Sequence, residues 1–533
     1  MSWKADGPQG NESDKIRFDV LPFCAKGGLD IGCGPHKVWP QMIGLDSGAD
    51  TALFNIQMRP DMFIKDATNL RQFSDASMPC VFSSHLLEHI IDYQAALKEW
   101  WRLVETGGHL VLYLPHRDLY PRIGQPGSNP DHKHDFAPAD IVDFCRLAFP
   151  DWSLLVNESR DQGNEYSFLL VFRKELAGAG QAEPWKAPKP EKAAAIVRLG
   201  GNGDALWAAS VAKVLHDQGY AVTLYAGANG GDVLRHDPYI ARIIELPPNV
   251  LDDADLLNYW ANEAPKYHKW VNLIGSVEHR LLPHQSQTDF YLPHAVRHRL
   301  MDVNYLDMVH AYADVPPPRE IGCGQKFYPS VAEADVAAEL RAQLPGKLVV
   351  ISPSGSGLFK TWPHAQHFMR LMAQHGVFTV MLGDLAGLPD LEPVTLDGVE
   401  YGHVVGREWP LRMALAYALT ADAVVATESV FANAVAYEDM LKVVMLSHSS
   451  NENLTRDWPN TIALEAPVAC HPCHRIHNAA STMCGKDTLT GASACMAWYS
   501  ADLVADFVLK HLGIARVAGK TQKSTLVDMR ETA

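Results

Sequence analysis

The stretch RLGGNGDALW, Arg198–Trp207, follows the apolar run AAAIV and precedes apolar residues at helical spacing. A strand, a glycine-rich turn and a helix in this order predict a unit of an α/β fold. Such turns usually bind phosphate through free backbone amides. This turn instead carries an acid, Asp204, where the helix dipole and the amides stabilise a carboxylate. Two roles stay open for Asp204, a proton acceptor in catalysis or a helix N-cap.

The same alternation of apolar strands and helical patterns continues along the chain, and it predicts parallel sheets covered by helices on both faces. The predicted strands are GGLDIG (27–32), MIGLD (42–46), CVFSSH (80–85), HLVLYLP (109–115), SFLLVF (167–172), AAAIVRL (193–199), AVTLYAG (221–227), KWVNLIG (269–275), KLVVISP (347–353), VFTVMLG (377–383), AVVAT (423–427) and KVVMLS (442–447).

The length of 533 residues exceeds what one core supports, so several domains are expected. A segment rich in Ala, Pro, Gly and charge, residues 176–192, is typical of a linker. It separates a first domain, residues 1–175, from a longer part. A weaker break divides that part into halves at 193–320 and 330–512, and the tail 513–533 is expected to be disordered.

The formal net charge of −16 argues against a large nucleic-acid-binding face. The polar N-terminus lacks the apolar region of a signal peptide, and no apolar run is long enough to span a membrane. These features predict a cytoplasmic protein, with peripheral membrane contact left open. The sequence does not indicate an oligomeric state.

The stretch GLDIGCGPHKVWPQMIGLD, Gly28–Asp46, predicts a nucleoside site. Its two strands flank an acid, Asp30, and a G-C-G turn, and ligands of open α/β sheets bind at this end of the strands. A dinucleotide fingerprint needs a third glycine where this chain has Lys37. A cofactor without a pyrophosphate fits better.

Residues 17–175 resemble a class I S-adenosylmethionine-dependent methyltransferase, through LDIGCG, Asp46, KDATNL, SSHLLEHIID and RLVETGGHLVLYLPH. The resemblance implies that Gly32 and Gly34 pack against the methionine part of the cofactor, beside Asp30. It implies that Asp46 binds the ribose hydroxyls and that Asp66 hydrogen-bonds the adenine amine. The residues from His85 to His89 are then expected to line a wall of the site.

The methyl acceptor is less clear from the sequence. The stretch NPDHKHDFAP places His132, His134 and Asp135 in one loop. One histidine is a candidate base that deprotonates an acceptor hydroxyl. A capping loop shaped by its histidines, or a metal site of these three residues, are the alternatives.

The later half contains a second strand end with polar residues, SPSGSGLFKTWP, Ser352–Pro363. Backbone amides near Ser352 and Gly355, together with Lys360, are suited to a diphosphate. At the end of another strand follow Thr427, Glu428 and Ser429, of which the acid is suited to sugar or ribose hydroxyls. A proton acceptor in one half and a cation in the other favour glycosyl transfer between facing domains.

Residues 193–512 resemble glycosyltransferase family nine, the ADP-heptose–lipopolysaccharide heptosyltransferases, which have a GT-B fold. The matching motifs are R-x-G-x-x-G-D at Arg198–Asp204 and K-x-W-P at Lys360–Pro363, whereas TESVFAN has Val430 and Asn433 where the family has Gly and His. The resemblance implies metal-independent inverting transfer, with Asp204 as base and Lys360 neutralising the departing phosphates. The two departures leave the donor sugar open.

Four late cysteines, Cys470, Cys473, Cys484 and Cys495, have a spacing that fits a structural zinc site. Reduced structural thiols and disulfides are the alternatives. The C-H-P-C piece also resembles a C-x-P-C of family nine, which makes inherited loop architecture a sufficient explanation.

The predicted fold class is therefore α/β, with an N-terminal Rossmann-like methyltransferase domain followed by a GT-B pair of facing Rossmann-like domains. The predicted function is bifunctional: glycosyl transfer from a nucleotide-diphosphate sugar to a glycan, plus methylation of that glycan or a related acceptor. Fusing the two modules raises the local concentration for consecutive steps. Two alternatives are modification of nucleic acid or protein, and a degenerate donor site in which only the methyltransferase is active.

Overall fold

The computed structural model describes residues 12–48, 59–182, 192–246, 253–276, 292–322, 324–388, 391–474 and 484–516. Most of the predicted linker (residues 183–191) and most of the predicted tail (residues 517–533) lie outside the described residues.

The chain forms two compact units, one made of residues 1–190 and 246–265 and the other of residues 191–245 and 266–533. The first unit thus includes helix α7 (Asp253–Glu263), which follows the predicted linker in sequence. In that unit Arg17 approaches Asp255 to 3.7 Å, and the ring centroids of Phe18 and Tyr259 lie 6.0 Å apart. The segment 253–263 therefore packs with the N-terminal unit.

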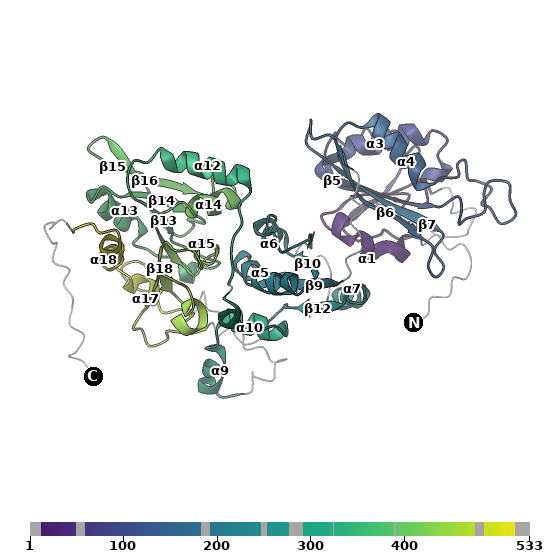
Figure 1. Cartoon of the computed structure of the whole chain (residues 1–533). Coiled ribbons are helices and arrows are strands. Elements are labelled where there is room, and N and C mark those ends of the chain that lie inside the picture. Colours follow the sequence, from purple (N-terminus) through teal and green to yellow (C-terminus); the bar gives the residue numbers. More distant parts are fainter. Residues whose placement is uncertain are drawn as a thin grey trace. The chain divides into compact units, whose positions relative to one another are not determined.

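The first unit contains an eight-stranded sheet in the order β3-β2-β1-β4-β5-β7-β6-β8 (Figure 1). Figure 1 shows α1 on one face of this sheet and α3 and α4 on the other. The elements are α1 (Ser13–Cys24), β1 (Gly28–Ile31), β2 (Met42–Asp46), β3 (Met62–Phe63), β4 (Met78–Ser84), η1 (Leu87–His89), α3 (Tyr93–Leu103), β5 (Val104–Pro115), α4 (Pro138–Ala148), β6 (Trp152–Arg160), β7 (Ser167–Lys174) and β8 (Gln181–Ala182).

Strands β1 to β5 pair in parallel, whereas β7 runs antiparallel to both β5 and β6. The apolar runs of β1, β4 and β5 are buried because helices cover both faces. Strand β2 pairs with one side of β1, and β4, which follows later in the chain, pairs with the other side of β1. A crevice at the carboxyl ends of β1 and β4 follows from this reversal of strand order.

The second unit contains two sheets, a four-stranded one in the order β11-β10-β9-β12 and a seven-stranded one in the order β15-β16-β14-β13-β17-β18-β19. All the strands of the first are parallel, and in the second only β15 is antiparallel to its neighbour. The strands are β9 (Ala193–Arg198), β10 (Ala221–Ala226), β11 (Arg242–Glu245), β12 (Lys269–Asn272), β13 (Leu348–Ser352), β14 (Phe378–Leu382), β15 (Val394–Leu396), β16 (Val399–Gly406), β17 (Ala423–Thr427), β18 (Leu441–Leu446) and β19 (Thr461–Glu465).

Helices join the two sheets of this unit into one core: α5 contacts α15, and α6 contacts α14. The helices are α5 (Asn202–Asp217), α6 (Ala228–Val233), α9 (His294–Met301), α10 (Tyr305–Tyr312), α11 (Pro318–Ile321), α12 (Val331–Ala342), α13 (Ala365–Gln374), α14 (Leu411–Ala418), α15 (Val430–Ala434), α17 (Ala494–Trp498) and α18 (Ala501–His511), with shorter turns η4 (Leu358–Lys360) and η5 (Asn451–Thr455). The turn η2 (Ala264–Lys266) begins in the first unit and ends at the first residue of this part of the second.

The predicted α/β class is confirmed, and each of the predicted strands overlaps a strand of the structure. Each sheet has one pair of neighbouring parallel strands at which the strand order turns back: β1 and β4, β9 and β12, and β13 and β17. The predicted glycine-rich and polar turns follow β1, β9 and β13, at the positions where open α/β sheets bind ligands.

Candidate functional sites

A cavity of about 260 Å³ opens at the carboxyl ends of β1, β2 and β4. Gly32 and Gly34 have φ angles of 78° and 59°, a region that favours glycine. A Cβ atom added at Gly32 would lie 2.9 Å from Leu86 Cδ2, so a larger residue would have to displace that side chain. Most of the sequence-predicted residues line this cavity, namely Asp30, Gly32, Gly34, Asp46, His85, Leu86 and His89, whereas Leu87 and Glu88 do not.

Two carboxylates shape the glycine turn. Asp30 is buried and accepts a hydrogen bond from the Val38 amide at 2.7 Å, and burial raises its pKa to about 7. Asp46 ends β2 and accepts from the amides of Gly34 at 3.0 Å and Gly48 at 2.7 Å. Both side chains therefore hold backbone in place around the cavity, and Asp46 presents its carboxylate at the cavity edge.

Asp66 lies at the same end of the sheet but does not line the cavity, although its neighbours Lys65 and Ala67 do. Its Oδ1 accepts from the Thr68 hydroxyl at 2.6 Å and the Thr68 amide at 2.8 Å, and these bonds lower its pKa. The carboxylate is thus engaged in a local turn, and a bond to adenine stays a prediction.

The two predicted loop histidines lie in different surroundings. His134 Nε2 lies 3.0 Å from the Ile90 carbonyl oxygen and 3.1 Å from that of Ile91, so this nitrogen donates and fixes the loop. His132 is buried, and burial lowers its pKa to about 4, which keeps the ring neutral near pH 7. Its Nε2 lies 3.9 Å from Glu88 Oε1.

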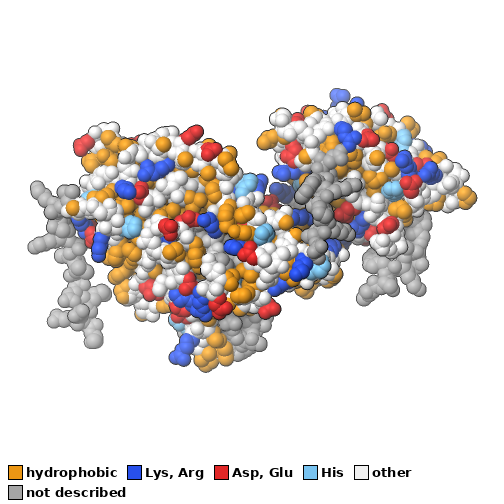
Figure 2. Space-filling model, in the orientation of Figure 1, with side chains coloured by type: hydrophobic (Ala, Val, Ile, Leu, Met, Phe, Trp, Pro, Cys, Tyr) orange, Lys and Arg blue, Asp and Glu red, His pale blue; other side chains and the backbone are white. Residues whose placement is uncertain are grey.

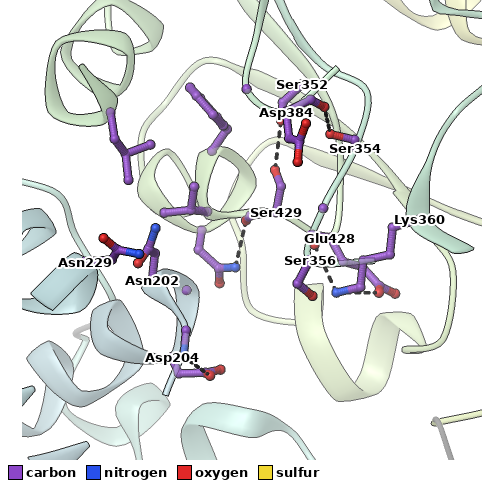
Figure 3. Close-up of a pocket in the computed structure, with 18 of the residues that line it drawn as sticks. Asn202, Asp204, Asn229, Ser352, Ser354, Ser356, Lys360, Asp384, Glu428 and Ser429 are labelled. Atoms are coloured by element: carbon purple, nitrogen blue, oxygen red, sulfur yellow. Dashed lines mark hydrogen bonds and ion pairs between the residues drawn. The ribbon is translucent and has the colours of Figure 1, made fainter. Parts of the chain in front are cut away.

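A larger cavity, of about 670 Å³, lies in the second unit between the carboxyl ends of its two sheets. In Figure 3, Asn202 and Asp204 extend from one side, and Ser352, Lys360 and Glu428 lie on the other. Of the sequence-predicted residues, Asp204, Ser352, Gly355, Lys360, Glu428 and Ser429 line this cavity, whereas Thr427 does not. Segments more than 200 residues apart in sequence thus meet at one site.

Asp204 occupies the third position of α5, and its carboxylate accepts from the Gly201 amide at 2.9 Å. Arg198, at the end of β9, lies 3.0 Å from the same carboxylate oxygen and is itself buried. The side chain of Asp204 retains 24% of its exposure, toward the cavity. It therefore takes part in a capping interaction, with Gly201 as the N-cap residue, and still faces the space where an acceptor can bind.

Lys360 is only 7% exposed and lies beside Glu428, with Nζ 3.2 Å from the Glu428 carbonyl oxygen and 3.6 Å from Oε2. A Cβ at Gly355 would lie 2.6 Å from the Lys360 side chain, so this glycine permits the close approach. Its contacts with Glu428 hold the cation at the cavity wall.

The Glu428 carboxylate is surrounded by donors. Oε1 accepts from the amides of Ser447 at 2.9 Å, His448 at 3.1 Å and Ser449 at 2.9 Å. Oε2 accepts from the Ser447 hydroxyl at 2.8 Å and contacts the His448 imidazole. The charges of His448 and Lys360 and these amides hold its pKa well below the usual range despite burial. The carboxylate organises the loop after β18, and its predicted contact with donor hydroxyls stays a prediction.

Of the three predicted hydroxyl residues, Ser352 and Ser429 belong to this wall and Thr427 lies behind it. Ser352 Oγ lies 3.2 Å from Ser429 Oγ, and Ser429 caps α15 by accepting from the Ala432 amide at 3.4 Å. Thr427 is fully buried at the end of β17, and its hydroxyl has no hydrogen-bond partner among the described residues.

Asn433, the departure from the family pattern, is a cavity residue that no sequence signal assigned to a contact. Its Oδ1 accepts from Trp207 Nε1 at 2.8 Å and from Gln325 Nε2 at 3.2 Å, and its Nδ2 donates to the Ser429 carbonyl at 3.0 Å. The side chain therefore ties α5 to α15 across the cavity.

The four late cysteines lie in the second unit, Cys470 exposed, Cys473 and Cys484 half-buried and Cys495 buried. Burial raises the pKa of Cys484 and of Cys495. No disulfide is formed by any of the eight cysteines in the described ranges. The sulfur atoms are not gathered closely enough for three of them to share an ion, and zinc stays a prediction.

Residues 29–112 match the family model of a methyltransferase domain. The chain is a transferase. Its structure is similar to a glycosyl transferase family 9 protein of Veillonella parvula, at 15% identity over 60% of this chain and 97% of that chain, with a TM-score of 0.44. It is similar to E. coli ADP-heptose lipopolysaccharide heptosyltransferase II, at 14% identity over 60% and 98%, with a TM-score of 0.44. It is also similar to a SAM-dependent methyltransferase of Archaeoglobus fulgidus, at 14% identity over 31% and 95%, with a TM-score of 0.22.

No curated protein matches the sequence. Within the described ranges, every helix is too short or too polar to cross a bilayer.

Proposed function

We propose that this chain is a bifunctional glycan-modifying enzyme, which transfers a sugar from a nucleotide-diphosphate donor and methylates the glycan or its acceptor. The observation that carries the transferase part is the 670 Å³ cavity, which has an acid on one wall and a buried cation on the other. Acidic and basic side chains are interspersed on the face in Figure 2, which fits a small glycan better than a nucleic acid.

In the proposed transfer, the acceptor hydroxyl oxygen attacks the anomeric carbon while the bond from that carbon to the phosphate oxygen breaks. Asp204 takes the hydroxyl proton, and its bonds to Arg198 and the Gly201 amide favour the ionised form that this role needs. The diphosphate leaves with the bonding electrons, and Lys360 neutralises its charge.

For methylation, S-adenosylmethionine fits the smaller cavity. The positive φ angles of Gly32 and Gly34 bring backbone to the cavity edge, and Asp46 offers a carboxylate suited to ribose hydroxyls. The cofactor supplies an electrophilic methyl group when bound. The chain's own residues hold the nucleoside, and His85 and His89 line the wall on the acceptor side. A cytoplasmic location fits both cosubstrates and the absence of disulfides from the described ranges.

The proposal is tested by a nucleotide-sugar binding and hydrolysis screen on the wild type, Asp204→Asn and Lys360→Met. Asparagine still accepts from the Gly201 amide, so Asp204→Asn removes the base and keeps the cap. We expect turnover to fall about 10²–10⁴-fold with donor affinity retained, and Lys360→Met to weaken donor binding about tenfold or more.

Asp217→Asn is the matched control, because Asp217 lies on the same helix, is exposed and pairs only with surface groups at the far end. Unchanged turnover in Asp204→Asn would leave Asp204 as a cap. If no donor binds any version, the cavity is a degenerate donor site. Labelled methyl groups that never reach a product of the transferase unit would refute the link between the two activities.

A further inference from the structure

Four side chains converge at the edge of the 260 Å³ cavity. Glu88 and His89 lie in turn η1, His85 precedes that turn, and His132 comes from the loop between β5 and α4. The atoms His85 Nδ1, His89 Nε2 and His132 Nε2 lie 3.9, 3.8 and 3.9 Å from the same oxygen, Glu88 Oε1. Ligand atoms of Glu88, His89 and His132 all lie within 4.8 Å of one another.

These separations are too long for hydrogen bonds. The carboxylate of Glu88 is 0% exposed, and neither of its oxygens has a hydrogen-bond partner among the described residues. A buried, unpartnered carboxylate is expensive, whereas a cation among the four groups satisfies it. Zinc bonds of about 2.0–2.2 Å place tetrahedral ligand atoms about 3.3–3.6 Å apart. The present separations, which lie within 4.8 Å, therefore contract by up to about 1 Å when an ion binds.

The surrounding contacts orient the rings as metal ligands require. His89 Nδ1 lies 3.1 Å from Asp131 Oδ2, so this nitrogen donates and leaves the Nε2 lone pair directed at Glu88. The loop carrying His132 is fixed on the turn, because the amides of Lys133 and His134 donate to the Glu88 carbonyl at 2.8 and 3.2 Å. The cluster is thus held in place by groups that are not themselves ligands.

We propose that Glu88, His89 and His132 bind a divalent transition-metal ion, with His85 on its fourth side. One carboxylate and two or three imidazoles form a donor set suited to Zn²⁺ or Fe²⁺ rather than Mg²⁺ or Ca²⁺. The site differs from the metal alternative raised by the sequence, since His134 is bonded to two carbonyls and Asp135 accepts from the Ile123 amide.

The ion would act on the methyl acceptor, an inference that rests on the proposed methyltransferase function. His85, His89 and Asp131 line the 260 Å³ cavity, so the ion would lie at its edge. An acceptor hydroxyl that coordinates the ion has a lowered pKa and gives its proton more easily to solvent water. The resulting alkoxide oxygen then forms the new bond to the methyl carbon as the bond from that carbon to sulfur breaks, and the sulfur keeps the electron pair.

The test measures metal binding on the untagged full-length chain by calorimetry with Zn²⁺ and by elemental analysis. A background carrying Cys470→Ser, Cys473→Ser, Cys484→Ser and Cys495→Ser removes the competing thiolates of the late cysteines. In this background we expect one Zn²⁺ per chain, bound at least about tenfold more weakly after Glu88→Gln or His132→Ala. His134→Gln is the matched control, because it changes a histidine of the same loop that faces two carbonyls, and it should bind Zn²⁺ like the background.

Absence of Zn²⁺, Co²⁺ or Fe²⁺ binding in the folded background protein, or equal binding in all variants, overturns the site. A Co²⁺ derivative with thiolate-to-metal absorption places the ion at the cysteines and overturns it as well. Circular dichroism checks folding, and His132→Ala keeps the test valid if Glu88→Gln does not fold.

If Zn²⁺ binds at the site and no methyl transfer is found, the site stands and the proposed function fails. If methyl transfer is equal with and without Zn²⁺, the acceptor role fails.

Discussion

Replacing Glu428 by Gln separates a structural role of this carboxylate from the ligand-binding role that the sequence suggests. Glutamine has the same shape but replaces one acceptor oxygen by an NH₂ group. In the native site both oxygens face donors, namely three amides, the Ser447 hydroxyl, His448 and the Lys360 ammonium. The NH₂ group of the glutamine therefore faces a hydrogen-bond donor, where the native carboxylate had an acceptor oxygen.

The size of the effect follows from these contacts. Removing one charge from a buried ion pair is destabilising by about 3–5 kcal/mol, and Lys360 is left buried without its anion. A 3 kcal/mol change lowers the Tm of a unit of this size by about 4 °C. We therefore expect Glu428→Gln to lower the Tm of the second unit by that amount before any donor is added.

The assay is scanning calorimetry of wild type, Glu428→Gln and Glu438→Gln, with the last as control because Glu438 forms only a partly exposed pair with Lys326. The control should shift by no more than about 0.5 kcal/mol. The folded-state pKa of Glu428 is lowered, so its contribution is present above the ordinary pKa of 4.5 and is lost as the pH falls through the folded-state value. The gap between wild type and variant should therefore narrow below about pH 4.5. A variant with native Tm and weakened donor binding would refute the structural role.

Two further predictions concern the buried groups around the cavities. The pKa of Asp30 is raised from 3.8 to about 7, so the folded state holds a proton that the unfolded state has released, and stability falls as the pH rises through this window. Asp30→Asn should abolish this loss of stability, which amounts to up to about 4 kcal/mol at 1.4 kcal/mol per pKa unit. If the free energies of unfolding of wild type and variant, measured with denaturant from pH 4 to 8, changed equally with pH, the prediction would be wrong. Trp207→Phe removes the Nε1 bond to Asn433 and should lower the free energy of unfolding by about 1 kcal/mol. The control Trp498→Phe, at a partly exposed side chain, should leave the free energy of unfolding unchanged. Equal urea midpoints for the two variants would show that the hydrogen bond between Trp207 and Asn433 does not stabilise the fold.

Strands and their turns were predictable from the sequence because their signals are local. The apolar runs of β1, β9 and β13 and the small or polar residues after them follow one another within ten residues. Strands β6, β16 and β19 were not predicted, since they mix exposed and buried positions and carry no continuous apolar run. Their formation depends on pairing with neighbours such as β7, β14 and β18.

The partners of the site residues were not predictable in the same way. Sequence spacing placed Glu428 at a strand end, but the loop that takes up its carboxylate begins 19 residues later, after β18. Asn433 was visible only as a departure from a motif, and its partner Trp207 lies 226 residues away. The H-x-x-E-H order of residues 85–89 was visible, but the third imidazole comes from a loop more than 40 residues later.

By itself, therefore, the sequence determined the α/β class, the turns that follow β1, β9 and β13, and the residues in those turns. Strand propensity, glycine conformation and helix dipoles act over a few residues, so their signals are local. Only the tertiary structure decided which of those side chains accept hydrogen bonds from backbone amides of the loops beside them, as Glu428 and Asp66 do, and which face a cavity, as Asp204 does. Hydrogen bonds and ion pairs act over a few ångströms of space, and the fold alone determines which distant segments come that close.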